Sequence, residues 1–282
     1  MSTIELRNIY FTYNRKTPSA VCALDNVSLE IDGERDGITG LIGHTGSGKS
    51  TLVQLLNGLI KPDSGEVILD GINIWDEPKK IREVRFKAGL VMQYPEYQLF
   101  AETVGEDIAF GPRNMGLSGD ELEERINEAA RFSGLTPDML AKSPFELSGG
   151  QKRRAALAGV IAMRPRILIL DEPAAGLDPA GRRDILGGIR KYALESNTTV
   201  LIVSHSMEDM AMYCDNLVVM SAAKILMHGS CADVFSKYRE LTEVGLDVPE
   251  ITRIAAALCE RGVDVGHDIY TVDYAVRKIC GK

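Results

Sequence analysis

The sequence has no long apolar run, no excess of positive charge and no closely spaced cysteine pair. Its longest apolar stretches, near residues 167–170 and 200–203, fall far short of the roughly 20 residues that a membrane-spanning helix needs. Its 32 Lys and Arg residues against 40 Asp and Glu residues give a formal net charge of −8. Since this charge argues against a partner held mainly through nucleic-acid phosphates, we expect a soluble protein that binds no nucleic acid.

Cysteine is scarce, and its spacing predicts neither a disulfide framework nor a metal-binding CxxC pair. The four histidines also lack the spacing of a ligand cluster. The first residues, MSTIELRN, lack the basic and apolar segments of a secretory signal, so we expect a cytoplasmic protein whose membrane role, if it has one, is peripheral. We expect buried or unreactive thiols at Cys22, Cys214, Cys231, Cys259 and Cys280.

The composition and length are typical of a globular α/β protein. Hydrophobic residues make up 45% and charged residues 26% of the 282 residues, which suits one large domain with a small addition. Between Ile4 and Ile42, apolar runs separated by turn residues predict several strands. Leucines at helical spacing predict a helix over 50–60, and GEVILDG over 65–71 predicts another strand.

The second half of the sequence alternates between helical and strand patterns. Residues 100–165 predict a helical insert, in which Ser118 and Glu121 predict a capping box at a helix start. The runs RILILDEP and TTVLIVSH are typical of strands buried on both faces, so they predict a parallel sheet. A final hairpin is predicted over 216–229.

The last fifty or so residues are predicted to be an addition to the main domain. Two short amphipathic helices are expected there, over 249–262 and 271–279. The predicted division places the main domain at 1–228 and a C-terminal extension at 229–282.

A phosphate loop is predicted at residues 43–50, which read GHTGSGKS and match G-x-x-x-x-G-K-[ST]. The pattern follows an apolar strand and opens a helix, as such a loop requires. Its glycines allow backbone N–H groups to wrap around phosphates, and the helix N-terminus adds a favourable dipole. We predict that the loop binds ATP, with Lys49 at the β- and γ-phosphates and the Ser50 hydroxyl on Mg²⁺.

Two carboxylates follow the strand predicted over 167–170, at the edge where a parallel sheet presents its ligand crevice. Taken alone, an acidic pair before a proline is equally consistent with an ordinary strand end. Together with the phosphate loop, the pair predicts that Asp171 holds Mg²⁺ through water and that Glu172 is the general base for the attacking water.

A second anion-binding helix end is predicted at residues 147–151, which read LSGGQ and place Ser148 at an N-cap. With this motif between the phosphate loop and the acidic strand, the sequence resembles the ATP-binding cassette superfamily over most of its length. The resemblance implies an α/β P-loop NTPase (RecA-like) core with an antiparallel β subdomain. It further implies an inserted helical subdomain at about 100–165 and a small C-terminal helical extension.

The resemblance also implies roles for residues outside these motifs. Gln93 would contact Mg²⁺ and the attacking water, His205 would sense the γ-phosphate, and Asp178 would signal across a dimer. Tyr13 is the candidate for stacking on adenine, but the extra loop at 14–23 leaves room for another partner. The expected catalytic residues are Glu172, His205 and Gln93, and the expected Mg²⁺ ligands are Ser50, Gln93 and Asp171. The expected ATP-binding residues are Tyr13, Gly43, His44, Thr45, Gly46, Ser47, Gly48, Lys49, Ser50, Thr51, Ser148, Gly149, Gly150, Gln151 and Asp178.

Within the superfamily, the segment YPEYQLFAETVGEDIAFGP at 94–112 closely resembles ATPases of energy-coupling factor (ECF) importers and their relatives in cobalt and nickel uptake. The extended N-terminal loop and Tyr94 are most similar to the second of the two ATPase paralogues in ECF systems that serve several vitamins. Two alternatives remain: a dedicated cobalt or nickel importer ATPase that pairs with itself, or a soluble cassette ATPase acting on nucleic acid or ribosomes. The segment between the phosphate loop and LSGGQ lacks coiled-coil heptads, which disfavours a soluble ATPase of the DNA-repair or chromosome type.

An ECF ATPase implies several partners. These are a second ECF ATPase in a head-to-tail homo- or heterodimer, a transmembrane T-component docked beside Gln93 and, indirectly, substrate-binding S-components. The implied cofactors are ATP and Mg²⁺, and the implied location is the cytoplasmic face of the cell membrane. Ala174 and Ala175 depart from the family, which commonly has a Thr after the proline, so dimer signalling is in doubt. The C-terminal helices either help hold two ATPases together or are a packing extension.

Overall fold

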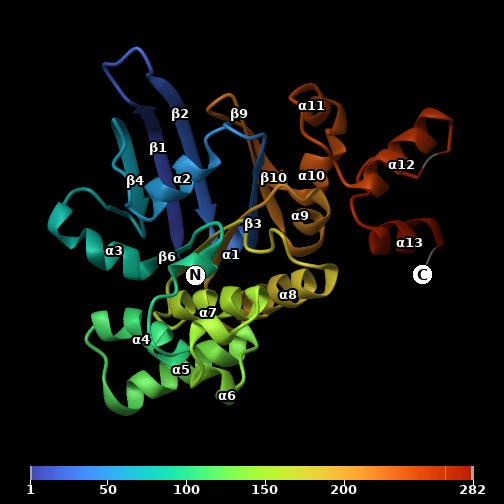
Figure 1. Ribbon diagram of the computed structural model, residues 1–282. Helices are drawn as coiled ribbons and strands as arrows, with labels where there is room; N and C mark the ends of the chain where they lie inside the picture. Colours follow the sequence, from blue (N-terminus) through green and yellow to red (C-terminus); the bar gives the residue numbers. More distant parts are fainter. Residues whose placement is uncertain (1, 264, 281–282) are drawn as a thin grey trace.

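Two β-sheets with helices around them make up the computed structural model, which describes residues 2–263 and 265–280 (Figure 1). Within these ranges, a four-stranded sheet has the order β2-β1-β4-β5. A six-stranded sheet has the order β10-β9-β3-β8-β7-β6. The α/β fold expected from the sequence is confirmed.

The four-stranded sheet forms from the N-terminal part of the chain and is antiparallel. Apolar side chains alternate along its strands, and Ile4 and Leu6 of β1 are buried while Glu5 between them is not. The strands predicted in this region are confirmed. Their bounds are β1 (Thr3–Tyr13), β2 (Val21–Asp32), β4 (Ser64–Leu69) and β5 (Ile72–Asn73).

The six-stranded sheet is parallel from β6 to β9, and β10 forms an antiparallel hairpin with β9. Strands β3 and β8 are buried along their whole length, as expected for central strands covered on both faces. The predicted parallel sheet and final hairpin are therefore confirmed. The bounds are β3 (Ile38–Gly43), β6 (Ala88–Val91), β7 (Ile167–Asp171), β8 (Thr199–Val203), β9 (Asn216–Ser221) and β10 (Lys224–Ser230).

The parallel sheet divides the core into two apolar clusters. Leu168 and Leu170 of β7 belong to the cluster beneath the helices. Ile167 and Ile169 belong to the cluster shared with the four-stranded sheet. This division follows from the alternation of side chains along a strand, and each buried aliphatic side chain stabilises the fold by about 1.5–3 kcal/mol. The carboxyl ends of the parallel strands are thereby held in place on both faces.

Helices and 3-10 turns connect the strands of the two sheets. The helix predicted over 50–60 is confirmed as α2, which ends at Leu56, and Gly58 with φ +69 then turns the chain. The connecting helices are α1 (Gly33–Asp36), α2 (Lys49–Leu56), α3 (Ile81–Lys87), α8 (Pro179–Ser196) and α9 (Met207–Tyr213). The 3-10 turns are η1 (Pro78–Lys80), η2 (Pro95–Gln98) and η3 (Pro144–Glu146).

The segment predicted to be helical, 100–165, forms the green and yellow-green helices in the lower part of Figure 1. Its helices are α4 (Val104–Asn114), α5 (Gly119–Ser133), α6 (Pro137–Leu140) and α7 (Gly149–Ile161). The predicted capping box at Ser118 is wrong, because Ser118 occupies the N-cap position but its side chain makes no capping hydrogen bond. Gly119 has φ +59, so the first turn lacks the helical geometry that would aim amides at the Ser118 hydroxyl.

The C-terminal extension is helical, and its α12 and α13 lie to one side of the main body (Figure 1). The two predicted helices are confirmed, and a small cluster of Ala255, Ile269 and Ala275 joins them. Strand β10 runs to Ser230, so it crosses the predicted boundary at residue 228. The bounds are α10 (Cys231–Ser236), α11 (Tyr238–Glu243), α12 (Glu250–Glu260) and α13 (Val272–Cys280). Among the described helices, none has the length and apolar character needed to cross a bilayer.

The cysteines differ in their surroundings. Cys214 and Cys231 are buried, as predicted, whereas Cys259 is half-buried. Cys22 is exposed, since it lies on β2 near the start of the strand, so of the two expectations burial does not apply to it. The side chain of Cys280 lies outside the described part of the chain.

Candidate functional site

The loop from Gly43 to Ser50 connects the buried strand β3 to the N-terminus of α2. Gly48 has φ +105, and a Cβ added there would collide with the carbonyl oxygen of Ala23. At Gly43 an added Cβ would lie 2.6 Å from the Ser47 hydroxyl oxygen. Only glycine fits these two positions, because one needs a left-handed backbone and both lack space for a side chain. The backbone is thus folded into a tight loop whose amides precede a helix N-terminus.

The Lys49 side chain lies inside this loop. Its Nζ donates hydrogen bonds to the carbonyl oxygens of Gly43 at 2.6 Å and His44 at 3.0 Å. Burial lowers the pKa of Lys49, although the carboxylates of Glu172 and Asp171 oppose the shift. The ammonium group is therefore placed among the loop carbonyls and close to the acidic end of β7.

Asp171 ends β7 close to the first turn of α2. Burial raises the pKa of its carboxyl group, while a hydrogen bond from Ser50 and the charge of Lys49 act against that rise. The Ser50 hydroxyl and the Asp171 carboxylate thus form one oxygen-rich pair. Hard cations such as Mg²⁺ prefer oxygen ligands of this kind.

Glu172 follows Asp171 with an unusual backbone. Its φ is +54, an uncommon value for a residue with a side chain, and its N–H donates to the carbonyl oxygen of Val203 at 3.0 Å. The side-chain oxygen Oε1 is buried and has no hydrogen-bond partner. Burial, followed by the negative charge of Asp171, raises the pKa of Glu172 to about 7. A carboxylate with such a pKa is suited to take up a proton near neutral pH.

His205 follows β8 and lies beside Glu172. Its Nε2 is 3.5 Å from the Glu172 Oε1, and the Ser204 hydroxyl donates to Glu172 Oε2 at 3.5 Å. Burial and the nearby charge of Lys49 lower the pKa of His205, so the imidazole is largely neutral at pH 7. The side chain is 55% exposed, which leaves the ring accessible from the cavity beside it.

These groups line a single cavity of about 410 Å³. Residues from six separate segments of the sequence meet there, including Gln93 after β6 and Tyr13 at the end of β1. The sequence-predicted residues that line it are Tyr13, Thr45, Gly46, Gly48, Lys49, Ser50, Thr51, Gln93, Asp171, Glu172 and His205. His44 points its Nδ1 to the Thr45 carbonyl oxygen at 2.9 Å, and Ser47 is fully buried within the loop.

Tyr13 contacts the site through its hydroxyl group, which is 3.2 Å from the Thr51 hydroxyl. Its ring packs edge-to-face against Phe11 and remains 38% exposed. A flat, partly exposed ring at the mouth of the cavity is a suitable surface for stacking.

Three residues that sequence patterns did not single out also line the cavity: Val21, Cys22 and Ala23. They reach it because β2 begins at Val21 and pairs with Tyr13 of β1. The sequence prediction placed these residues in the extra loop at 14–23, whereas in the structure they begin β2. Their contribution therefore becomes visible only in the folded sheet.

The LSGGQ segment and Asp178 lie away from this cavity. Ser148 caps α7, accepting a hydrogen bond from the Gln151 N–H at 3.3 Å, while the Ser148 N–H donates to the Gln151 Oε1 at 2.9 Å. Asp178 caps α8 through the Gly181 N–H at 2.7 Å. Ser148, Gly150 and Gln151 border a separate cavity of about 220 Å³. Within one chain, the predicted residues thus fall into two separate groups: those around the phosphate loop and those around the LSGGQ helix end.

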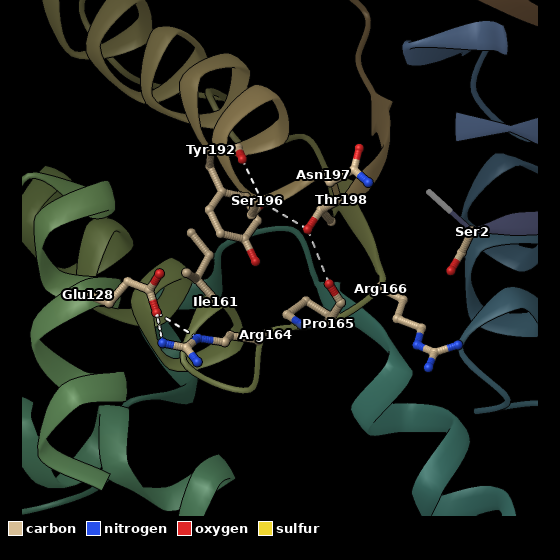
Figure 2. A pocket seen from close by; sticks show the side chains of 10 residues that line it. All are labelled: Ser2, Glu128, Ile161, Arg164, Pro165, Arg166, Tyr192, Ser196, Asn197 and Thr198. Atoms are coloured by element: carbon tan, nitrogen blue, oxygen red, sulfur yellow. Dashed lines mark hydrogen bonds and ion pairs between the residues drawn. The ribbon is translucent and has the colours of Figure 1, made fainter. Parts of the chain in front are cut away.

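Another cavity, of about 450 Å³, lies at the opposite end of the parallel strands (Figure 2). The Tyr192 ring extends into it, and its hydroxyl group is buried without a hydrogen-bond partner. Both arginines of the cavity are ion-paired, Arg164 with Glu128 and Arg166 with Asp70. This cavity is lined by residues at the C-terminal ends of α7 and α8 and by residues that precede the strands. None of the predicted site residues lines it.

Known proteins are similar to this chain in sequence and in fold. The ABC transporter family pattern matches residues 24–175. Energy-coupling factor transporter ATP-binding protein EcfA2 from Caldanaerobacter subterraneus subsp. tengcongensis is 49% identical, over 98% of this chain and 96% of its own. The solved structure of cbiO1 from Clostridium perfringens, part of the ABC transporter complex cbiONQ, is similar with a TM-score of 0.75 and 34% identity, over 91% of this chain and 98% of its own. A dimeric ATP-binding cassette in a post-hydrolysis state, bound to ADP and Pi, has a TM-score of 0.72 and 26% identity, over 81% of this chain and 98% of its own.

Proposed function

Because the chain belongs to the ABC transporter family and, within it, to the energy-coupling factor ATP-binding proteins, we propose that it binds and hydrolyses ATP as a subunit of an ECF-type importer. The observation that carries the proposal is the buried Oε1 of Glu172, which has no hydrogen-bond partner and belongs to the cavity of the phosphate loop. A buried carboxylate oxygen without a partner is costly, and a reacting water molecule at this position would satisfy it. The transported substrate would be a vitamin or another micronutrient.

The residues of the cavity fit a magnesium–nucleotide complex. The loop has no room for side chains at Gly43 and Gly48, and the Ser47 hydroxyl is buried without a hydrogen-bond partner. In the proposed complex, the loop amides and Lys49 bind the phosphates, and Ser50, Gln93 and Asp171 hold Mg²⁺. When bound, Mg²⁺ neutralises charge on the phosphate oxygens. The Tyr13 ring and the apolar surface of Val21 then form the end of the cavity that binds the adenine base.

Glu172 takes the proton of the attacking water in the proposed reaction. Its pKa of about 7 makes it a stronger base than an ordinary carboxylate, and its strained backbone is held in place by Val203. His205 is neutral and close enough to Glu172 to orient the water or contact the γ-phosphate. Gln93 lines the same cavity, so its amide orients the water from the other side.

A second cassette completes the site. The N-terminus of α7, capped by Ser148, carries free amides and a positive dipole end that suit the γ-phosphate of a partner subunit. Since this helix end does not border the phosphate-loop cavity of its own chain, we propose a head-to-tail pair. Asp178 lies at the start of α8, where it would meet the partner. Exposed apolar side chains of α13, at Val272, Val276 and Ile279, support an additional contact between the two ATPases.

The membrane subunit would dock on an apolar groove of about 300 Å³ between α3, α4 and α7. Phe100 and Phe110 form its exposed rim, with ring centroids 5.0 Å apart, and Asp107 fixes the rim by accepting hydrogen bonds from the N–H groups of Phe100 and Ala101. We call this surface the docking groove. Exposed aromatic pairs of this kind mark protein-protein contacts. The proposed location is therefore the cytoplasmic face of the membrane.

Co-purification tests the proposed function. The tagged chain, extracted from membranes in mild detergent, is expected to bring down an integral-membrane subunit and a second cassette ATPase. Replacing Phe100 and Phe110 by Asp should abolish recovery of the membrane subunit while leaving ATP binding intact. Leu194→Asp is the matched control, because Leu194 is an exposed apolar residue of α8 outside the groove. Recovery of ribosomes or DNA without a membrane protein would overturn the proposal.

A further inference from the structure

A buried ion pair joins the segment after Gln93 to the helix that follows LSGGQ. Arg153 donates from Nη2 to Glu96 Oε1 at 2.9 Å and from Nε to Glu96 Oε2 at 3.2 Å. The Arg153 and Glu96 side chains are only 6% and 16% exposed. Burial raises the pKa of Glu96, but the hydrogen bond and charge of Arg153 outweigh this and hold the pKa below its ordinary value. The pair is therefore ionised and bidentate in the folded protein.

Arg153 also reaches the segment that contains the proposed general base. Its Nη1 donates to the carbonyl oxygen of Ala175, and the Ala175 N–H donates to the carbonyl oxygen of Glu172 at 3.2 Å. One guanidinium group thus bridges η2 and the turn that begins at Glu172. Among the ion pairs of the described residues, it is the only one with both side chains less than a fifth exposed.

The same two elements also build the docking groove. Leu99 and Phe100 follow directly after η2, and Ala155 and Ala156 follow Arg153 on α7. A partner that presses on this groove therefore acts on both ends of the ion pair. Because a guanidinium–carboxylate fork has fixed geometry, a shift of Glu96 is passed to Arg153 and from there to Ala175.

We propose that Glu96 and Arg153 are positioning residues through which occupancy of the docking groove sets the placement of Glu172 and so the rate of ATP hydrolysis. This inference rests on the proposed function. Neither side chain lines the cavity that holds the phosphate loop, so both act on the reaction through other residues.

The test compares ATP turnover by the isolated chain with turnover by the complex co-purified from membranes. The variants are Glu96→Gln, Arg153→Gln and the charge exchange that combines Glu96→Arg with Arg153→Glu. Arg164→Gln is the control, because Arg164 is also a doubly paired arginine but lies beyond the C-terminal end of α7. For each protein, kcat, KM and ATP affinity are measured.

The expected result is a fall of about 10- to 100-fold in kcat of the complex for Glu96→Gln and Arg153→Gln, with KM and ATP affinity little changed. The basal rate of the isolated chain and the Arg164→Gln complex should stay near wild type. The charge exchange should recover none of the loss, because a Glu at position 153 cannot donate to the Ala175 carbonyl oxygen. The proposal is wrong if both single variants keep full turnover in the complex. It is also wrong if they no longer bind ATP, which would make the pair merely structural.

Glu172→Gln in the same assay separates this inference from the proposed function. If Glu172→Gln is inactive while the ion-pair variants behave as wild type, only the positioning role fails. If Glu172→Gln hydrolyses ATP at the wild-type rate, the proposed site itself fails.

Discussion

At the scale of single residues, the proposed reaction depends on the carboxylate of Glu172. Its left-handed backbone is a strained conformation for a side-chain-bearing residue, and it directs a buried oxygen toward the cavity. The residue types and order of the motifs were enough to predict Lys49, Asp171 and Glu172. They did not predict the backbone strain at Glu172 or the presence of residues 21–23 in the cavity wall. Both depend on strand pairing across the sheets.

Replacing Glu172 by Gln should remove the proton acceptor and keep the shape of the side chain. We expect the loss of general-base catalysis to lower kcat by about 10²- to 10⁴-fold, with nucleotide affinity preserved. Steady-state hydrolysis and fluorescent-nucleotide binding, measured on the same preparation, check this. Unchanged turnover would assign the base to another residue.

The pKa of Glu172 also predicts a pH profile. A general base works in its ionised form, and this form gains population as pH rises through the pKa of about 7. The value of kcat/KM should therefore rise from pH 6 toward pH 8, by close to tenfold for each unit below the pKa. The residual activity of Glu172→Gln should lose this rise. A profile that is flat in the wild-type protein across this range would contradict the assignment.

Cys22 offers a probe of the base-binding end of the cavity. It is exposed beside Tyr13, whereas Cys231 is buried with a pKa raised to about 12 and Cys214 is buried with its pKa raised as well. A maleimide should therefore label Cys22 in a chain whose Cys259 and Cys280 are changed to Ser. ATP at about ten times its dissociation constant should slow labelling about tenfold, because the nucleotide covers the thiol. If ATP leaves the labelling rate unchanged, the adenine base binds elsewhere.

At the scale of elements, the sequence predicted the strands and the longer helices well, because their apolar periods are regular. It failed at Ser118, where the serine stands at the helix start but Gly119 changes the geometry of the first turn. It also could not show that η2 and α7 are joined by a buried ion pair, since Glu96 and Arg153 are far apart in the chain. Contacts of this kind follow from packing of the helical segment and not from local pattern.

Ser148→Ala should damage the helix end that the account assigns to the partner's nucleotide. Loss of the cap destabilises the start of α7 by about 0.5–2 kcal/mol and should lower hydrolysis by the paired ATPases, without weakening ATP binding to the chain's own loop. Melting temperature, nucleotide affinity and turnover of the complex are measured together. Ser230→Ala is the matched control, because Ser230 caps α10 in the same manner far from the motif. Equal losses of turnover in both variants would mean that Ser148 serves only as a cap.

At the scale of the whole molecule, the proposed pairing makes the chain one side of a nucleotide site. The phosphate loop and acidic strand end share one cavity, and the LSGGQ helix end borders another. The fold and the family were predictable from motif order, and the head-to-tail arrangement was predicted from the resemblance. The identity of the second cassette depends on contact surfaces such as the exposed apolar side chains of α13. The sequence of these surfaces alone does not identify the partner.

The specific ATPase activity of the isolated chain, verified as a monomer by its mass, tests this account most directly when compared with that of the membrane complex. A half-site lacks the partner's helix end, so the monomer should hydrolyse ATP slower by on the order of 10²-fold, while it still binds ATP. Turnover per chain should rise when the second cassette is added. A verified monomer that hydrolyses ATP as fast as the complex would contradict the account.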